Sequence, residues 1–293
     1  MPKTLFHSLN QMHTLIEKTP QNLSDKIILI GGQALIAWVH AYNIDTLTGE
    51  QYINLASDDI DFMGSKASVI ECATCWSGQA ILPTMDDNTE QTGRVRLTEL
   101  NTKGEAQVVD FLGKTYGIPT CDVEKWCDKL VINNSEKSVQ VISPPLCLLS
   151  RIKNLTGYMK NSCETNKARE LSRVKSAITI THSYVIDIVK YDLENNSNMA
   201  TKKVVRYLTK TLLKDKEVIK LSSLYSIDFD DIFPEIIKRV DPNIYNQDAT
   251  TSLNKFKNAV DKKTKSRTLR ERQKAQKLHR LAQKITESHP NAT

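Results

Sequence analysis

DIDFM, residues 59–63, alternates acidic and apolar side chains. A period of two is typical of a β-strand whose two faces meet different surroundings. The pattern predicts a strand on which Asp59 and Asp61 share one face, with the apolar residue after each of them in the core. Two neighbouring carboxylates repel each other unless a cation lies between them, and hard oxygen ligands at this spacing suit Mg²⁺ or Mn²⁺. We therefore expect a divalent metal ion at this strand.

A short apolar run, Ile27–Ile30, precedes this stretch and is interpreted as a buried strand. It ends at Gly31 and Gly32, and helical composition begins with Gln33. Glycine carries no Cβ, so the backbone at this junction can approach a ligand closely. The helix that follows directs its free amides and the positive end of its dipole at that ligand, which suits a triphosphate.

A third strand, EAQVVDFL at residues 105–112, places Asp110 among apolar neighbours. A lone carboxylate in such a strand is costly unless it is paired or bound to metal. Residues 94–100 are interpreted as a further strand that forms a hairpin with it. If the strand of Asp110 lies beside that of Asp59 and Asp61, the three acids converge on two metal ions. Such a pair of ions clamps the attacking and leaving oxygens of an in-line phosphoryl displacement.

The runs GGQAL, DDIDF and VVDF stand in this order along the chain. Together they resemble the nucleotidyltransferase superfamily related to DNA polymerase beta. Within that superfamily, GGQALIAW and SDDIDF are most similar to the AbiEii-type (MenT-like) toxins of bacterial toxin–antitoxin systems. The resemblance covers residues 27–112 well and residues 143–175 loosely. It implies an α+β fold, with an N-terminal polymerase-beta-like nucleotidyltransferase domain of mixed sheet and flanking helices, followed by a C-terminal helical domain.

The resemblance also implies roles for individual residues. Asp59 and Asp61 would bind both metal ions, while Asp110 would ligate the catalytic metal and help to activate the acceptor hydroxyl. An NTP is the implied co-substrate, held by the glycine turn, by the segment before the DxD strand and by two lysines of the helical motifs. These nucleotide-binding residues are Gly31, Gly32, Gln33, Ser57, Lys153 and Lys167.

Two departures from the family pattern stand out. Asp59 follows Gly32 by 27 positions, a longer gap than the family shows, so an insertion is expected at residues 43–54. The second helical motif lacks the usual pair of lysine and aspartate, and Glu170 would have to stand in for its acid. A plain solvated helix face remains the alternative reading of Arg151 and the two motif lysines.

The sequence changes character after Ile142. Ser143 followed by two prolines is a typical helix start, and the pattern is mostly helical from there onward. We therefore divide the chain into a catalytic domain, residues 1–142, and a helical domain, residues 143–293. Within the first domain the pattern predicts helices at residues 4–18 and 65–76 and polar turns at residues 43–54.

The composition is that of an ordinary globular protein, with 40% hydrophobic and 25% charged residues. No apolar run has the length of a membrane span, and the N-terminus lacks a signal-peptide core, so no membrane partner is expected. The six cysteines show one CxxC spacing, at Cys72 and Cys75, and no second one to complete a zinc site. Free thiols are the simpler interpretation, and they indicate a cytoplasmic protein.

Positive charge is concentrated near the C-terminus. Between Lys255 and Lys284, twelve Lys and Arg stand against two acids, a local net charge of +10, whereas the whole chain carries only +6. Such density favours a polyanionic partner, and RNA is expected because the related toxins modify tRNA ends. The nucleic-acid-binding candidates are Lys262, Lys263, Lys265, Arg267, Arg270 and Arg272. The same segment could instead dock an acidic antitoxin, or simply be the charged face of a terminal helix.

The leading hypothesis is therefore a metal-dependent nucleotidyltransferase that moves NMP from an NTP to the 3′ end of a tRNA. Its biological role would be that of a toxin in a toxin–antitoxin or phage-defence system. One alternative keeps the fold and changes the acceptor, to a small molecule or a protein side chain. Another is a catalytically silent nucleic-acid-binding protein, which would have no reason to keep three acids on apolar strands.

Overall fold

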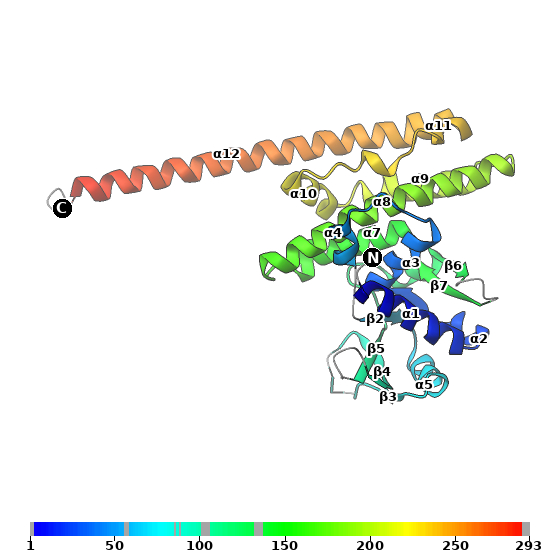
Figure 1. Cartoon of the computed structure of the whole chain (residues 1–293). Coiled ribbons are helices and arrows are strands. Elements are labelled where there is room, and N and C mark those ends of the chain that lie inside the picture. Colours follow the sequence, from blue (N-terminus) through cyan, green and yellow to red (C-terminus); the bar gives the residue numbers. More distant parts are fainter. Residues whose placement is uncertain are drawn as a thin grey trace.

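A computed structural model of the chain describes residues 3–55, 59–84, 86–87, 89–100, 106–131 and 137–288. These residues form one mixed sheet of seven strands and twelve α-helices, so the expected α+β class is confirmed (Figure 1). The strands are β1 (Ile28–Ile30), β2 (Ile60–Met63), β3 (Gln79–Ile81), β4 (Gln91–Leu100), β5 (Ala106–Leu112), β6 (Cys127–Val131) and β7 (Ser138–Ile142).

The helices account for most of the second half. They are α1 (Lys3–Lys18), α2 (Gln21–Ser24), α3 (Gly31–Ala41), α4 (Gly49–Leu55), α5 (Lys66–Cys75), α6 (Thr120–Lys125), α7 (Pro144–Lys153), α8 (Glu164–Glu194), α9 (Met199–Tyr207), α10 (Lys216–Tyr225), α11 (Ile237–Val240) and α12 (Thr251–Ser288). A π-helical turn, η1 (Asn154–Tyr158), continues α7. None of the helices in the described residues combines the length and apolar character that a bilayer crossing requires.

The strand order in the sheet is β3-β4-β5-β2-β1-β7-β6. β2 pairs with β5 in parallel and with β1 in antiparallel, so the three expected strands lie side by side. β4 and β5 form the expected antiparallel pair, while their connection at 101–105 lies outside the described residues. Ile60 and Phe62 are fully buried, whereas Asp61 between them faces the other side. The period-two interpretation of DIDFM is thereby confirmed.

Helices pack on the sheet much as their sequences suggest. α5 begins at Ser65, whose hydroxyl accepts a hydrogen bond from the Ser68 amide, the expected capping contact. α5 lies against β3 and β4, and α3 lies against β1 and β2. The indole of Trp38 on α3 donates to the carbonyl of Ile142, which ties α3 to the junction between β7 and α7. This contact anchors the C-terminal half of α3 at that junction.

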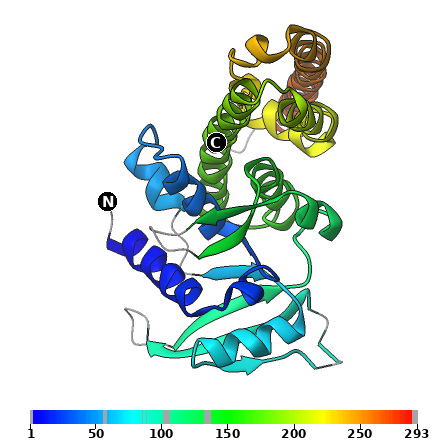
Figure 2. The same ribbon diagram turned by 90° about the vertical axis from the view of Figure 1, so that its right-hand side faces the viewer.

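The helices from α8 onward stack on one another beside the part of the chain that carries the sheet (Figure 1; Figure 2). β7 ends at Ile142 and α7 begins at Pro144, so the change from strand to helix falls where the sequence placed it. Buried residues of both halves belong to one hydrophobic core. The division into two domains at residue 142 stays a prediction.

Some elements differ from the sequence-based expectation. Residues 43–54 were interpreted as polar turns, but from residue 49 they belong to α4, because this helix buries Leu55 and packs on α8. The strands β3, β6 and β7 were not predicted, since their short sequences alternate only weakly. Ser143 precedes α7 without making a side-chain cap, and its side chain is buried.

Candidate active site

Gly31 brings the start of α3 against the DxD strand. Its φ is +73°, in the left-handed region that side chains disfavour, and a Cβ at this position would lie only 2.3 Å from Asp61 Oδ2. Ile30 and Asp61 are also direct neighbours in the pairing of β1 with β2. Glycine is therefore required at position 31 for two reasons. The backbone conformation there disfavours a side chain, and the Asp61 carboxylate leaves no room for a Cβ.

Replacing Gly31 with Ala is expected to destabilise the fold by about 1–3 kcal/mol, because the new Cβ is strained and displaces the Asp61 carboxylate. Gly49→Ala is the matched control, since a Cβ there meets nothing within 4 Å and Gly49 lies in a helix. Denaturant unfolding of the two variants measures the difference. Equal stability of Gly31→Ala and the unchanged chain would show that the turn is not constrained in this way.

Asp61 and Asp110 are opposite each other in the parallel pairing of β2 with β5. The two carboxylates therefore converge, as the sequence predicted. Asp110 already has a counter-ion, because Arg94 Nε lies 2.7 Å from its Oδ1. Arg94 stands opposite Asp110 on β4, a pairing that follows from hairpin register and was missed at the level of sequence.

Asp61 occupies an unfavourable environment for a negative charge. Burial raises the pKa of Asp61 to about 6; the carboxylates of Asp110 and Asp59 add to this, and Arg151 and Arg173 partly oppose it. A cation close to Asp61 would relieve both the burial penalty and the repulsion. The side chain is thus arranged to meet a positive group that comes with a ligand.

The donor set is of the kind that a divalent cation prefers, namely carboxylate oxygens at a polar cavity. In the described part of the chain, no three His, Cys, Asp or Glu side chains already stand together as a formed metal site. Asp59 and Asp61 line the cavity, whereas Asp110 is engaged by Arg94. A cation would therefore be held by Asp59 and Asp61, with Asp110 joining in exchange for Arg94.

A cavity of about 440 Å³ opens at this point of the molecule, within the size range of small-molecule sites. One wall is formed by the glycine turn and the two acids of the DxD motif. The opposite wall comes from the segment after β5 and from α7 with η1. The residues that line it are Ile30, Gly31, Gly32, Asp59, Asp61, Glu90, Leu112, Lys114, Thr115, Tyr116, Ile142, Cys147, Ser150, Arg151, Asn154, Tyr158, Met159 and Arg173. Thr115 is buried here, and its hydroxyl has no hydrogen-bond partner among the described residues.

Two buried arginines supply positive charge to this cavity. Glu170 on α8 lies between them, 3.3 Å from an Arg151 nitrogen and 3.2 Å from an Arg173 nitrogen. Arg173 also donates to the carbonyl of Asn54, the residue before the end of α4. Burial lowers the pKa of Arg173, and the neighbouring Arg151 lowers it further. Two guanidinium groups held by one carboxylate leave a net positive charge next to Asp61, which suits an anionic ligand.

Arg173 was not predicted, although a signal for it existed. It follows Glu170 by three residues on the same helix, so the two side chains are neighbours on one face. Glu170 was expected to provide the acid of the second helical motif at the site. In the structure it instead faces Arg151 and Arg173 with no exposed side-chain surface.

The structure does not bring the expected lysines to the cavity. Lys153 lies 2.5 Å from Asp215, the residue before α10, and Lys167 pairs with Glu164 on its own helix. Gln33 is completely buried within α3 and does not line the cavity, while Ser57 lies outside the described residues. The positive charge assigned to the two lysines is found instead on the two arginines and on Lys114, which pairs with Glu90.

The basic segment forms most of α12, whose outer part extends well beyond the rest of the fold (Figure 1). Its inner turns bury Leu253 and Phe256, whereas Leu269 and Leu278 further along are exposed. The side chains of Lys262, Lys263, Lys265, Arg270 and Arg272 are exposed as expected. Arg267 differs, because it donates to the carbonyl of Ser223 and lies 3.6 Å from Glu271.

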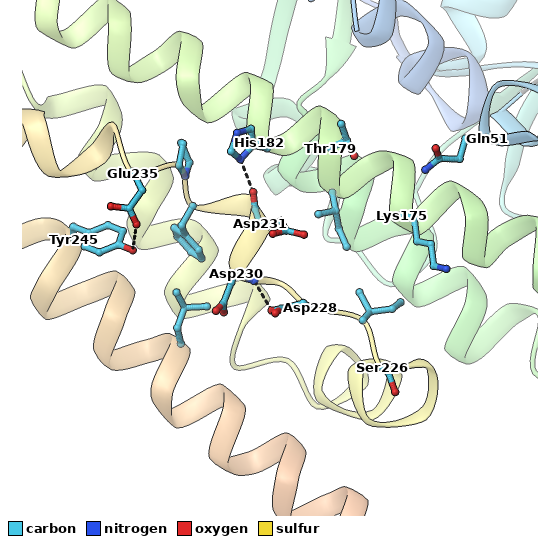
Figure 3. A pocket seen from close by; sticks show the side chains of 15 residues that line it. Gln51, Lys175, Thr179, His182, Ser226, Asp228, Asp230, Asp231, Glu235 and Tyr245 are labelled. Carbon is cyan, nitrogen blue, oxygen red and sulfur yellow. Dashed lines mark hydrogen bonds between the residues drawn. The ribbon is translucent and has the colours of Figure 1, made fainter. Parts of the chain in front are cut away.

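A larger cavity, of about 740 Å³, lies between α8 and the segment after α10 (Figure 3). Its described lining carries four acids against one lysine, Lys175, and one of the acids, Asp230, pairs with Lys257. Asp230 is half-buried and the other three acids are exposed, and no strand carboxylate or glycine turn is among the lining residues. An acidic surface of this kind repels a polyphosphate, so we identify the smaller cavity as the candidate active site.

No family model matches the sequence, and no curated protein does. Among solved structures, the chain is similar to the crystal structure of an antigenic nucleotidyltransferase-like protein from Paracoccidioides brasiliensis, over 59% of this chain and 77% of that one. The TM-score is 0.37 and the sequence identity is 13%. A similarity of this size establishes neither the fold nor the activity of this chain.

Proposed function

We propose that this chain is a metal-dependent nucleotidyltransferase, which moves a nucleoside monophosphate from an NTP to an acceptor hydroxyl. The observation that carries the proposal is the contact between the turn at Gly31 and the carboxylate of Asp61, with Asp110 in register beside it. This contact joins a helix start that binds phosphate to a strand that binds cations, at the wall of one cavity. The resemblance of the GG, DxD and later acid motifs supports the same reaction.

In the proposed reaction the acceptor oxygen attacks the α-phosphorus of the NTP. The bond from that phosphorus to the oxygen bridging to the β-phosphate breaks, and pyrophosphate leaves. Arg151, Arg173 and the amides at the start of α3 bind the negative charge of the triphosphate. Asp110, released from Arg94 when the ligands bind, accepts the proton of the acceptor hydroxyl. A divalent cation held by Asp59 and Asp61 would supply further neutralisation of charge on the phosphates.

We assign RNA, and in particular the 3′ end of tRNA, as the acceptor class. The support is the exposed positive charge on α12, which binds phosphate backbones without reading sequence. A toxin role, held in check by an antitoxin, belongs to the same proposal and rests on the resemblance of the GGQALIAW and SDDIDF motifs alone. The cytoplasm is the compartment in which such a reaction would take place.

Replacing Lys262, Lys263 and Lys265 together with Gln is expected to weaken RNA binding and make it less sensitive to salt. Each phosphate contact contributes about 0.7–0.9 to the slope of log affinity against log salt, so the slope should fall by about 2. The measurement is a filter-binding or anisotropy titration with tRNA at several salt concentrations. The control is the same triple change at Lys66, Lys190 and Lys210, which are exposed elsewhere; an equal effect in the two variants would contradict the assignment.

The proposed acceptor is tested by incubating the protein with total tRNA, Mg²⁺ and each NTP in turn, radiolabelled at its α-phosphate. Label that appears on tRNA with one NTP supports the reaction and the acceptor. Loss of that label with Asp59→Ala supports the role of this acid, and its loss with a chelator supports the need for metal. If label moves to another molecule, the acceptor assignment is wrong while the reaction class stands. If no label moves at all, the reaction itself is contradicted.

A further inference from the structure

The helical wall of the candidate active site presents one continuous face to the cavity. Its lining residues lie at positions i, i+3, i+4, i+7 and i+11 along α7 and η1, which places them in a row on one face. They are Cys147, Ser150, Arg151, Asn154 and Tyr158. Arg151 stands in the middle of this row, and the exposed aromatic ring of Tyr158 stands at its end. A ligand bound along it would meet positive charge at Arg151 and an aromatic face at Tyr158.

Two tyrosines form the aromatic end of this wall. Tyr158 is 74% exposed and Tyr116 is 43% exposed, and both line the cavity. Their ring centroids are 6.2 Å apart with an interplanar angle of 61°, an edge-to-face arrangement. Ligand pockets are lined largely by apolar and aromatic side chains, and these two exposed rings are accessible to a ligand in the cavity.

The local backbone holds the pair in this position. A Cβ at Gly157 would lie 2.5 Å from Tyr116 Oη, so a larger residue there would push the ring of Tyr116 aside. Gly157 belongs to the π-helical turn that also carries Tyr158. Such turns are rare, and they occur often at functional sites. The tyrosine pair is therefore formed where the π-helical turn meets the segment after β5.

We propose that Tyr158, supported edge-on by Tyr116, is the stacking platform for the base of the bound NTP. The inference rests on the proposed function, because it uses the arginine end of the cavity for the triphosphate. A planar base stacks on an aromatic ring whichever base it is, so the platform provides affinity for nucleotides over other polyphosphates. Asn154 stands between Arg151 and Tyr158 in the row, on the side of the cavity where the nucleoside would lie.

The test compares two ligands that differ in the base and sugar, namely ATP and inorganic tripolyphosphate, by calorimetric titration of the full chain. Tyr158→Ala should weaken ATP binding about 5- to 100-fold, the effect of losing one base stack, and leave tripolyphosphate binding unchanged. Tyr158→Phe keeps the ring and should bind ATP as the unchanged chain does. Tyr191→Ala is the control, because Tyr191 is 58% exposed and does not line the cavity.

Each other outcome is decisive. If Tyr158→Ala binds ATP with unchanged affinity, Tyr158 is not a stacking platform. The proposed function is then still supported, because both ligands bind. If ATP and tripolyphosphate are weakened equally, Tyr158 acts on the phosphates or on the fold, and the platform is again overturned. If the unchanged chain binds neither ligand, the proposed function and the platform fall together.

Discussion

Asp61→Asn is expected to abolish nucleotidyl transfer and at the same time to make the folded protein more stable. Removing one preorganised charged group from such a site typically lowers the rate by about 100- to 1000-fold. Asp61 should lie at or above the upper end of this range, since it is the acid that contacts the glycine turn and faces Asp110 across the strand pair. Transfer of an α-labelled nucleotide measures the loss.

The gain in stability follows from the buried charge. Burial raises the pKa of Asp61 to about 6 in the folded chain, from an ordinary value of 3.8, so folding disfavours the ionised form. The stability of the unchanged chain should therefore fall as the pH rises from about 4 through 6. A neutral Asn removes this penalty, which amounts to about 1–3 kcal/mol at pH 7. Thermal unfolding across this pH range, with a chelator present, measures it.

Asp86→Asn serves as the control for both effects, because Asp86 is exposed. It should change neither the rate of transfer nor the stability. If Asp61→Asn were less stable than the unchanged chain at pH 7, the carboxylate would have to be stabilised by its surroundings. If it kept full activity, Asp61 would have no part in the reaction.

Glu170→Ala is expected to destabilise the fold by about 3–5 kcal/mol, the cost of leaving a buried charge without its partner. Glu170 has no exposed side-chain surface, and Arg151 and Arg173 are about nine-tenths buried. Arg151 and Glu170 form an ion pair whose geometry is not that of a hydrogen bond, so their attraction is electrostatic. Without the carboxylate, the two guanidinium groups would repel each other across the cavity wall.

Glu164→Ala is the matched control, because Glu164 belongs to the same helix, pairs with Lys167 and is 89% exposed. Exposed pairs of this kind contribute about 0–1 kcal/mol. Denaturant unfolding should separate the two variants clearly. Equal midpoints for Glu170→Ala and Glu164→Ala would mean that the buried ion cluster does not support the fold.

The central part of the site could be predicted from sequence because its signals are local. The alternation of acidic and apolar residues in DIDFM indicates which side chains face the core. The carboxylate of Asp110 stands out because the residues around it are apolar. The pairing of Asp61 with Asp110 then followed from placing the two strands side by side. Gly31 was found because a strand followed by glycines and a helix is a recognisable backbone pattern.

The positive side of the site could not be predicted in the same way. Arg151 and Lys153 are two residues apart, so they point to opposite sides of α7 and only one can face the cavity. The choice between them depends on Asp215, which is distant in sequence and binds Lys153. Sequence periodicity predicts that this segment is a helix, but tertiary packing decides which of its faces is turned toward the sheet.

The short strands β6 and β7 show the same limit. Each has only five residues, and their partly buried patterns are too brief to separate a strand from a turn. β7 is added to the sheet by parallel pairing with β1, a contact between residues that are far apart in the chain. α4 was missed because its helical state depends on packing against α8.

The most direct test of the proposed reaction compares an NTP labelled at the α-phosphate with the same NTP labelled at the γ-phosphate. Each is incubated with the protein, Mg²⁺ and total RNA, beside the Asp61→Asn variant. Nucleotidyl transfer predicts that the α-label becomes attached to the acceptor, that the γ-label is released in pyrophosphate, and that the variant does neither. Attachment of the γ-label, or release of phosphate without any attachment, would contradict nucleotidyl transfer and show a kinase or a hydrolase instead.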